Sequence, residues 1–343
     1  MLTERQMLVL QVIIDEFIET AHPVGSRAIA KKGSVPYSAA TIRNDMADLE
    51  EKGFLDKTHS SSGRIPSEKG YRYYVDHIIA SLSGHSDKNV IKDIIQDGFY
   101  EFEQIVKLSA EVLSELTNYT SIILGPELLE TKLKQIQMIT LSPSTAVAIL
   151  VTNTGHVEHR TFSIPPEIKS SELEKMVNII NHHLSGSPVI SLPELFNSEM
   201  ISIMKKYLDD FDRSYHYLKT AFLPEQPVKL YIGGVSNILM QPEFNDVEKI
   251  RTFLSMMEKE DEIATLLKQT DDGINVTIGQ ENEVEAIKDF SLITATYRLD
   301  EGQHGTIALL GPTRMEYRRV ISLLKILSNE MTEALYMWYK NNG

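Results

Sequence analysis

The chain has 343 residues, of which 42% are hydrophobic, so it is long enough to bury large cores in two or three domains. It contains no cysteine, which excludes disulfides, thiolate metal sites and thiol nucleophiles. The formal net charge is −14, but residues 1–75 hold ten basic and ten acidic residues, so the acidic excess lies in the rest of the chain. With no long apolar run and no basic-then-apolar leader, we expect a cytoplasmic protein with no membrane contact.

Two helices are predicted at the start of the chain. Thr3 and Gln6 form a T-x-x-Q capping box for the first of them. Ser26 caps a short second helix, which carries Arg27 and Lys31. These two cations are placed for contacts with the phosphates of a nucleic-acid backbone.

A third helix follows, in which Ser38 is a good N-cap and Gly53 ends the helix. Ile42, Met46 and Leu49 recur at i, i+4 and i+7, and this spacing predicts one buried stripe. The helical period then turns a set of small and polar residues outward: Ala40, Thr41, Arg43, Asn44 and Ala47.

The outward residues suit the chemistry of DNA base edges. Arg43 can pair with guanine O6 and N7, and Asn44 with adenine N6 and N7. Ala40, Ala47 and the methyl group of Thr41 allow a close approach to a groove and to thymine methyl groups. An outward Arg–Asn pair by itself is also typical of an ordinary solvated helix, so the residues that follow must decide.

A β-hairpin is predicted over residues 54–66, directly after this helix. Lys57, His59 and Arg64 lie around its polar tip, where they favour contacts with phosphates. Helix, short helix, helix and hairpin is the order of a winged helix-turn-helix. In the next helix, Tyr71 and Tyr74 belong to an apolar face that favours packing over stacking on nucleic acid.

The remainder of the chain alternates strands and helices. Strand patterns flank a helix-rich stretch over residues 171–222, which indicates an α+β fold with one sheet domain interrupted by an insertion. The predicted strands lie at 133–141, 145–151, 156–162, 228–232, 275–278, 291–297 and 305–310, and a closing helix is predicted over 314–339.

Other chemistry has weak support in the sequence. His156 and His159 lie on opposite faces of a predicted strand, which argues against a shared metal. Gly233 and Gly234 favour a tight turn, because no phosphate-binding glycine motif surrounds them. Ser236 lacks the setting of a nucleophile elbow. We therefore expect no cofactor, no metal and no enzyme activity.

Several phrases of the sequence closely resemble the HrcA family, the heat-inducible transcription repressors of bacteria. They are PVGSRAIAKK, SAATIRNDMADLEEKGFLDKTHSSSGRIPSEKGYRYYVD, LTNYTSIILGP, LYIGG followed by QPEF, and ITATY followed by LLGPTRMEYRRVISLL. The resemblance implies a winged-helix DNA-binding domain over 1–80, a GAF-like domain in two parts over 81–168 and 228–343, and an inserted dimerisation domain over 169–227.

The same resemblance implies the partners of the protein. It implies a homodimer on double-stranded operator DNA, at an inverted repeat upstream of chaperone operons, which is released on heat stress. It also implies that the GroE chaperonin keeps the repressor active. Two other functions stay open at this point, namely a small-molecule sensor that uses an apolar pocket of the GAF-like domain and an enzyme with an accessory DNA-binding module.

Overall fold

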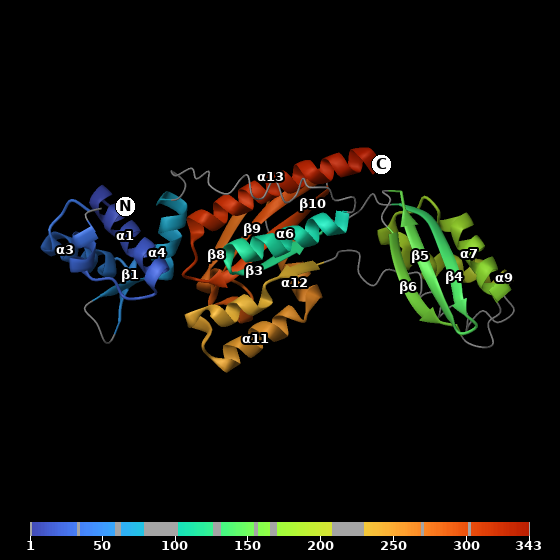
Figure 1. Cartoon of the computed structure of the whole chain (residues 1–343), viewed down its shortest axis with the longest axis horizontal. Coiled ribbons are helices and arrows are strands. Elements are labelled where there is room, and N and C mark those ends of the chain that lie inside the picture. The colour runs from blue at the N-terminus through green and yellow to red at the C-terminus, as the bar shows by residue number, and fades with distance from the viewer. Residues whose placement is uncertain are drawn as a thin grey trace.

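The computed structural model describes residues 2–32, 35–58, 63–78, 102–125, 132–153, 157–164, 170–207, 230–268, 271–300 and 303–342. The stretch 81–86, expected to be a linker, lies outside these ranges. None of the described helices is both long and apolar enough to cross a bilayer. Three parts can be distinguished: an N-terminal unit (residues 2–78), a sheet domain (102–125 and 230–342) and an inserted unit (132–207) (Figure 1).

The N-terminal unit contains three helices, a two-stranded antiparallel hairpin and a fourth helix. The bounds are α1 Glu4–Thr20, α2 Ser26–Lys32, α3 Ala39–Glu51, β1 Leu55–Lys57, β2 Arg64–Pro66, α4 Glu68–Tyr73 and the π-helical turn η1 Tyr74–Ile78. This order agrees with the prediction from the sequence.

Caps fix where these helices begin and end. Thr3 and Gln6 bond reciprocally at the start of α1, each through a 3.2 Å hydrogen bond, as the capping-box pattern predicts. Ser38 Oγ accepts from the backbone N–H of Thr41 at 3.2 Å and caps α3. Gly53 follows the helix with φ of +77°, a left-handed conformation that favours glycine. The chain can therefore turn directly into β1.

The sheet domain is built on five antiparallel strands in the order β7-β3-β10-β9-β8. Its main elements are α6 Phe102–Thr117, β3 Thr120–Leu124, β7 Leu230–Gly233, α11 Val247–Met257, α12 Glu260–Lys268, β8 Ile274–Ile278, β9 Phe290–Asp300, β10 Gln303–Pro312 and α13 Tyr317–Asn342. Short 3-10 turns are η5 Val235–Met240, η6 Pro242–Phe244, η7 Gly279–Glu281 and η8 Glu285–Ile287.

Helices cover both faces of this sheet (Figure 1). Ile123 and Ile307 point to the face packed by α6 and α13, whereas their chain neighbours Ile122 and Ala308 point to the core under α11 and α12. Successive side chains of a strand point to opposite faces, so each strand contributes to two cores. All five residues of β3 are buried for this reason.

The inserted unit has its own antiparallel sheet, in the order β4-β5-β6. The bounds are β4 Leu133–Ser142, β5 Thr145–Thr152, β6 Val157–Ser163, α7 Ser170–Leu184, η3 Val189–Ser191, α8 Leu192–Leu195, η4 Phe196–Met200 and α9 Ile201–Tyr207. Its core is separate from the cores of the sheet domain.

The domain boundary expected at residues 168/169 is corrected by this core. Ile136 and Leu150 from the strands pack in one cluster with Met176 and Ile180 from α7. The strands that were expected in the first part of a GAF-like domain therefore belong with the insertion. The inserted unit is α+β rather than helical, and its described part starts at Lys132, well before residue 169.

The N-terminal unit packs directly on the sheet domain, because one hydrophobic cluster runs from α1 to α13. The rings of Tyr71 and Tyr317 lie 5.7 Å apart, centroid to centroid. Arg314 Nη1 donates a 2.7 Å hydrogen bond to the Ile18 carbonyl. Burial raises the pKa of Tyr71 well above its usual value. The apolar face of the helix after the hairpin thus serves packing.

Candidate nucleic-acid interface

Helix α3 exposes the residues that the sequence analysis nominated for base contacts. Ile42, Met46 and Leu49 are buried, which fixes the rotation of the helix. Ala40, Arg43, Asn44 and Ala47 are consequently exposed, and Thr41 is half-buried. Arg43 forms no ion pair or hydrogen bond within the part of the chain that the structure describes. Its guanidinium is available to an outside acceptor.

The inner flank of α3 carries an acidic residue that the sequence analysis missed. Asp45 is 1% exposed, and its carboxylate accepts from Arg5 Nε at 2.7 Å and Nη2 at 3.1 Å. The side-chain hydrogen bond to Asp45 raises the pKa of Arg5. On the next turn, Asp48 accepts from Gln6 Nε2 at 3.1 Å. These contacts lock α3 against α1.

The hairpin after α3 carries Lys57 on β1, opposite Arg64 on β2. Lys57 is exposed and has no partner among the described residues. His59, at the predicted tip, lies outside the described residues. Backbone hydrogen bonds of 2.9 Å in both directions join Arg64 to Val24, so the hairpin is tied to the segment before α2.

Arg64 was expected near an open hairpin tip, but its side chain is paired and largely buried. Its guanidinium lies against Glu50, with Nε 2.7 Å and Nη2 2.5 Å from Oε2, and its side chain is only 16% exposed. Since Glu50 lies on the last turn of α3, the pair joins hairpin to helix. Arg64 therefore orients the hairpin, and a phosphate would have to compete with Glu50 for it.

Helix α2 supplies further cations beside α3, with which it packs. Arg27 and Lys31 are exposed, and neither pairs with any residue in the described ranges. The neighbouring Lys32 is different, because it forms an ion pair with Glu16 that raises its pKa. Arg27, Lys31 and Lys57 are therefore available for phosphate contacts while the outward face of α3 contacts bases.

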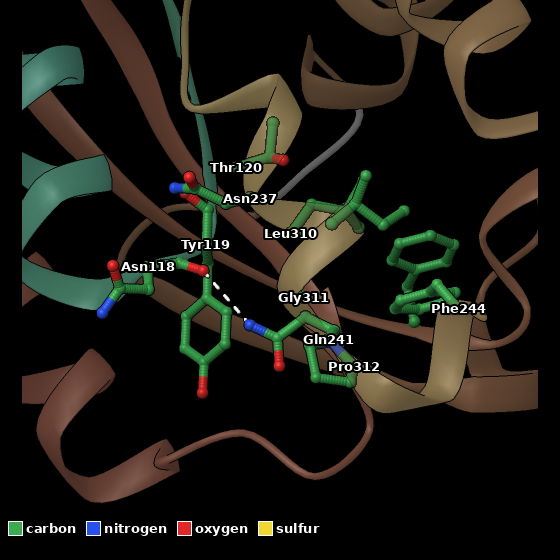
Figure 2. Close-up of a pocket in the computed structure, with 11 residues that line it drawn as sticks. Asn118, Tyr119, Thr120, Asn237, Gln241, Phe244, Leu310, Gly311 and Pro312 are labelled. Atoms are coloured by element: carbon green, nitrogen blue, oxygen red, sulfur yellow. Dashed lines mark hydrogen bonds between the residues drawn. The ribbon is translucent and has the colours of Figure 1, made fainter. Parts of the chain in front are cut away.

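Among the described residues, the sheet domain has a small hollow between η5, η6 and the ends of β3 and β10 (Figure 2). Its empty volume is about 190 Å³ including space open to solvent, whereas ligand pockets usually hold roughly 300–1,000 Å³. Gln241 Nε2 donates to the Asn118 carbonyl at 3.3 Å, and Asn237 Nδ2 donates to the Tyr119 carbonyl at 3.1 Å. Polar groups on its wall are therefore already paired with each other.

Metal and phosphate sites find little support in the described residues. Those residues contain no group of three or more His, Asp or Glu side chains that could hold a metal ion, and His156 lies outside them. Gly234 has φ of +65° and begins η5. A Cβ atom there would lie 1.8 Å from Ser114 Oγ, so the glycine serves a tight turn with a close approach.

Comparison with known proteins decides the family. The model of the HrcA protein C-terminal domain matches residues 103–321. A heat-inducible transcription repressor HrcA from Oceanobacillus iheyensis is 64% identical over 343 residues, which is 100% of both chains. The chain belongs to the HrcA family. The resemblance noted in the sequence is thereby confirmed.

Solved structures support the fold of this HrcA-family chain. A crystal structure at 2.2 Å resolution, described only as a hypothetical protein, covers 98% of this chain and 100% of its own, with a TM-score of 0.73 and 22% identity. That likeness concerns the fold alone. An IclR family transcriptional regulator from Brucella abortus covers 96% of this chain and 90% of its own at 12% identity, but its TM-score of 0.22 is too low to compare the folds.

Proposed function

We propose that this HrcA-family chain represses the transcription of heat-shock chaperone operons by binding an inverted-repeat operator as a homodimer, through a winged helix formed by α1–α3 and the hairpin. The proposal depends on one observation above all. Arg43 and Asn44 are exposed on the N-terminal half of a capped helix whose opposite stripe is fixed in the core. Recognition helices usually enter the major groove in this way.

The chemistry of α3 supports base readout by that half of the helix. Arg43 and Asn44 are suited to guanine and adenine, and a good bidentate pair gives about 1–3 kcal/mol of discrimination. Exposed Ala40 and Ala47 leave room for a close approach. The acidic residues Glu50 and Glu51 lie on the last turn, where they would be kept away from phosphate. The helix would therefore enter by its N-terminal end.

Phosphate contacts would come from the neighbouring cations. Arg27 and Lys31 on α2 and Lys57 on β1 are exposed and unpaired within the described part of the chain. His59 belongs to the same proposed hairpin tip. Arg64 is assigned a different role, since its pairing with Glu50 holds the hairpin against α3. Phosphate contacts of this kind set orientation and register rather than sequence preference.

A dimer is expected because one such domain gives a small interface, whereas dimers read two half-sites. We propose that the open face of the β4-β5-β6 sheet forms the dimer contact. Helix α7 packs on the other face. Ile139, Leu141 and Val157 are 49%, 62% and 53% exposed, and Ile139 pairs with Val147 on the open side. Exposed apolar patches of this kind mark protein–protein contacts.

The proposed link to the GroE chaperonin comes from the family resemblance. A surface feature of the sheet domain supports it. Leu239, Met240 and Val247 are 59%, 81% and 79% exposed, although they are apolar. Apolar side chains on a surface are the groups that a chaperone can hold. Adding purified chaperonin is expected to raise the fraction of repressor that binds operator, with no change in the sequence bound.

Selection of bound duplexes from a random pool, at a stated salt concentration, tests the proposal. The wild-type dimer is expected to enrich one inverted repeat, and Arg43→Ala is expected to lose that enrichment. Arg251→Ala is a matched control, because Arg251 is an exposed arginine of α11 in the sheet domain and pairs with no residue in the described ranges. Enrichment of no sequence by the wild type, or of the same repeat by Arg43→Ala, would contradict the proposal.

A further inference from the structure

Arg5 lies on the flank of α3 with its charge directed outward. Its guanidinium donates two hydrogen bonds to Asp45, from Nε to Oδ2 at 2.7 Å and from Nη2 to Oδ1 at 3.1 Å. The arginine side chain is 45% exposed and the aspartate side chain 1%. The carboxylate is thus inside and the cation outside. A partner that approaches from solvent meets the positive group first.

Tyr37 holds the same guanidinium from a second side. The Arg5 guanidinium carbon lies 5.6 Å from the centroid of the Tyr37 ring, within cation–π range. Tyr37 is 39% exposed and stands immediately before Ser38, the N-cap of α3. The cation is therefore held at the N-terminal half of the helix. Its Nη1 group makes no hydrogen bond with any described residue.

The dimensions of DNA place this flank beside a phosphate. An α-helix with its side chains is about 10–12 Å wide, and the major groove is about 12 Å wide. A helix that fills the groove brings its flanks to the two phosphate edges. Arg5 comes from α1, outside α3, and lies against one of these flanks.

We propose that Arg5, held by Asp45 and Tyr37, binds a backbone phosphate through Nη1 and so sets how α3 sits in the groove. This inference rests on the proposed binding of operator DNA. Arg5 acts as a positioning residue, since a phosphate contact carries no base preference of its own.

Comparison with the Arg64–Glu50 ion pair, also on α3, separates this role from a purely structural one. In the Arg64–Glu50 pair the arginine side chain is 16% exposed and the glutamate 33%, so the carboxylate is the more exposed partner. In the Arg5–Asp45 pair the order is reversed. Both pairs join elements of the fold, but only the second presents an unused N–H group beside the N-terminal half of α3.

The test compares Asp45→Asn with the double variant Arg5→Gln/Asp45→Asn. Neither contains a buried, unpaired carboxylate, and only the first retains the cation. Operator affinity is measured against salt concentration by fluorescence anisotropy. Asp45→Asn keeps the cation and a side-chain oxygen that can still accept from Arg5, so its slope of log affinity against log salt is the reference for the double variant. The double variant is expected to lose about 0.9 from the magnitude of that slope and to bind roughly 3- to 10-fold more weakly.

Arg5→Lys provides a second variant in case the first two fold poorly. It keeps a cation against Asp45, and hence the packing of α1 on α3, but it concentrates the charge on one nitrogen near that carboxylate. We expect a folded chain, checked by circular dichroism, with weaker operator binding. Equal slopes for the double variant and Asp45→Asn, or wild-type affinity for Arg5→Lys, would overturn the inference.

Failure of the inference can be told from failure of the proposed function. If Arg43→Ala loses the selected operator while the Arg5 variants keep wild-type affinity and slope, α3 reads DNA without help from Arg5. If the wild-type protein selects no duplex, the proposed function itself fails.

Discussion

Arg72 of α4 forms a two-point ion pair with Glu281 of η7, which ties the N-terminal unit to the sheet domain. Arg72 Nε donates to Glu281 Oε1 at 2.9 Å, and Nη2 also donates to the Val276 carbonyl at 2.5 Å. Glu68 accepts from the Gln280 N–H at 3.2 Å. The orientation of the proposed DNA-reading helix is thereby coupled to the position of β8.

Glu281→Gln is expected to loosen this junction while keeping the shape of the side chain. Because both partners are about one-third exposed, we expect a loss of only about 1 kcal/mol in the free energy of unfolding. Hydrogen exchange at residues 68–78 and 276–281 should become faster. Lys259→Gln, which removes an exposed ion pair with Glu262, is the control and should change neither quantity. Unaltered exchange in Glu281→Gln would show that the pair does not hold the junction.

Arg43 and Asn44 should differ in what they read. Arg43→Ala is expected to lose about 1–3 kcal/mol of operator affinity and to relax the preference for guanine at one position of each half-site. Asn44→Ala should do the same at an adenine. Binding is measured against a panel of single-base operator variants, and sedimentation should show an unchanged dimer. If a variant has the same base preferences as the wild type, the substituted residue does not read a base.

Lys57→Ala and Arg64→Ala should affect the salt dependence of DNA binding differently, although the two residues lie opposite each other in the hairpin. Lys57→Ala is expected to lower the magnitude of the salt slope by about 0.9, the value for one phosphate contact. Arg64→Ala should instead lower the melting temperature, since it breaks the pair with Glu50. If Arg64→Ala changes the slope and leaves stability intact, Arg64 binds phosphate and not Glu50 in the complex.

The open face of the inserted sheet should control assembly. Ile139→Lys places a charge on the open face of the sheet and is expected to yield monomers in sedimentation velocity, with weaker operator binding as a consequence. Leu254→Lys is the matched control, because Leu254 is an exposed apolar residue of α11 that belongs to neither proposed contact surface. If Ile139→Lys still forms a stable dimer, the dimer contact lies on another surface.

Tyr74 should make stability sensitive to alkaline pH. Desolvation first, and then its 2.6 Å hydrogen bond to Asp15, raise the pKa of Tyr74 above its usual value of 10. Because the folded-state pKa is the higher one, this contribution is complete below pH 10 and declines as the pH rises above 10. Tyr74→Phe should lose about 1 kcal/mol at pH 8. The loss should shrink between pH 10 and 11 in urea titrations; a constant difference would contradict the assignment.

The N-terminal unit could be predicted closely because its signals are local. The capping pair Thr3–Gln6, the N-cap Ser38 and the stripe from Ile42 to Leu49 all act within one or two helical turns. Asp45 also falls on the inward side of that stripe. Its burial escaped prediction because it depends on Arg5, which lies 40 residues earlier in the chain.

The sheet domain was harder to predict because its contacts are distant in sequence. Strand β3 is a run of five buried residues with no alternation, and such a run does not distinguish strand from helix. Helices α11 and α12 were not predicted. The sequence also holds no local sign that β4 to β6 pack on α7 rather than join β3, since only the shared core decides this.

The pairing of β3 affects how the chain is made. Ile123 lies opposite Ile307, a residue that is synthesised roughly 180 positions later, and the other edge of β3 is covered by β7, which follows the whole inserted unit. At about 5–20 residues per second, the ribosome needs roughly 5–20 s to supply β7, the first of these partners to be made. During that interval β3, whose five residues are all buried in the native fold, has neither neighbouring strand in place. Protection of this one segment during translation should therefore govern the yield of native repressor.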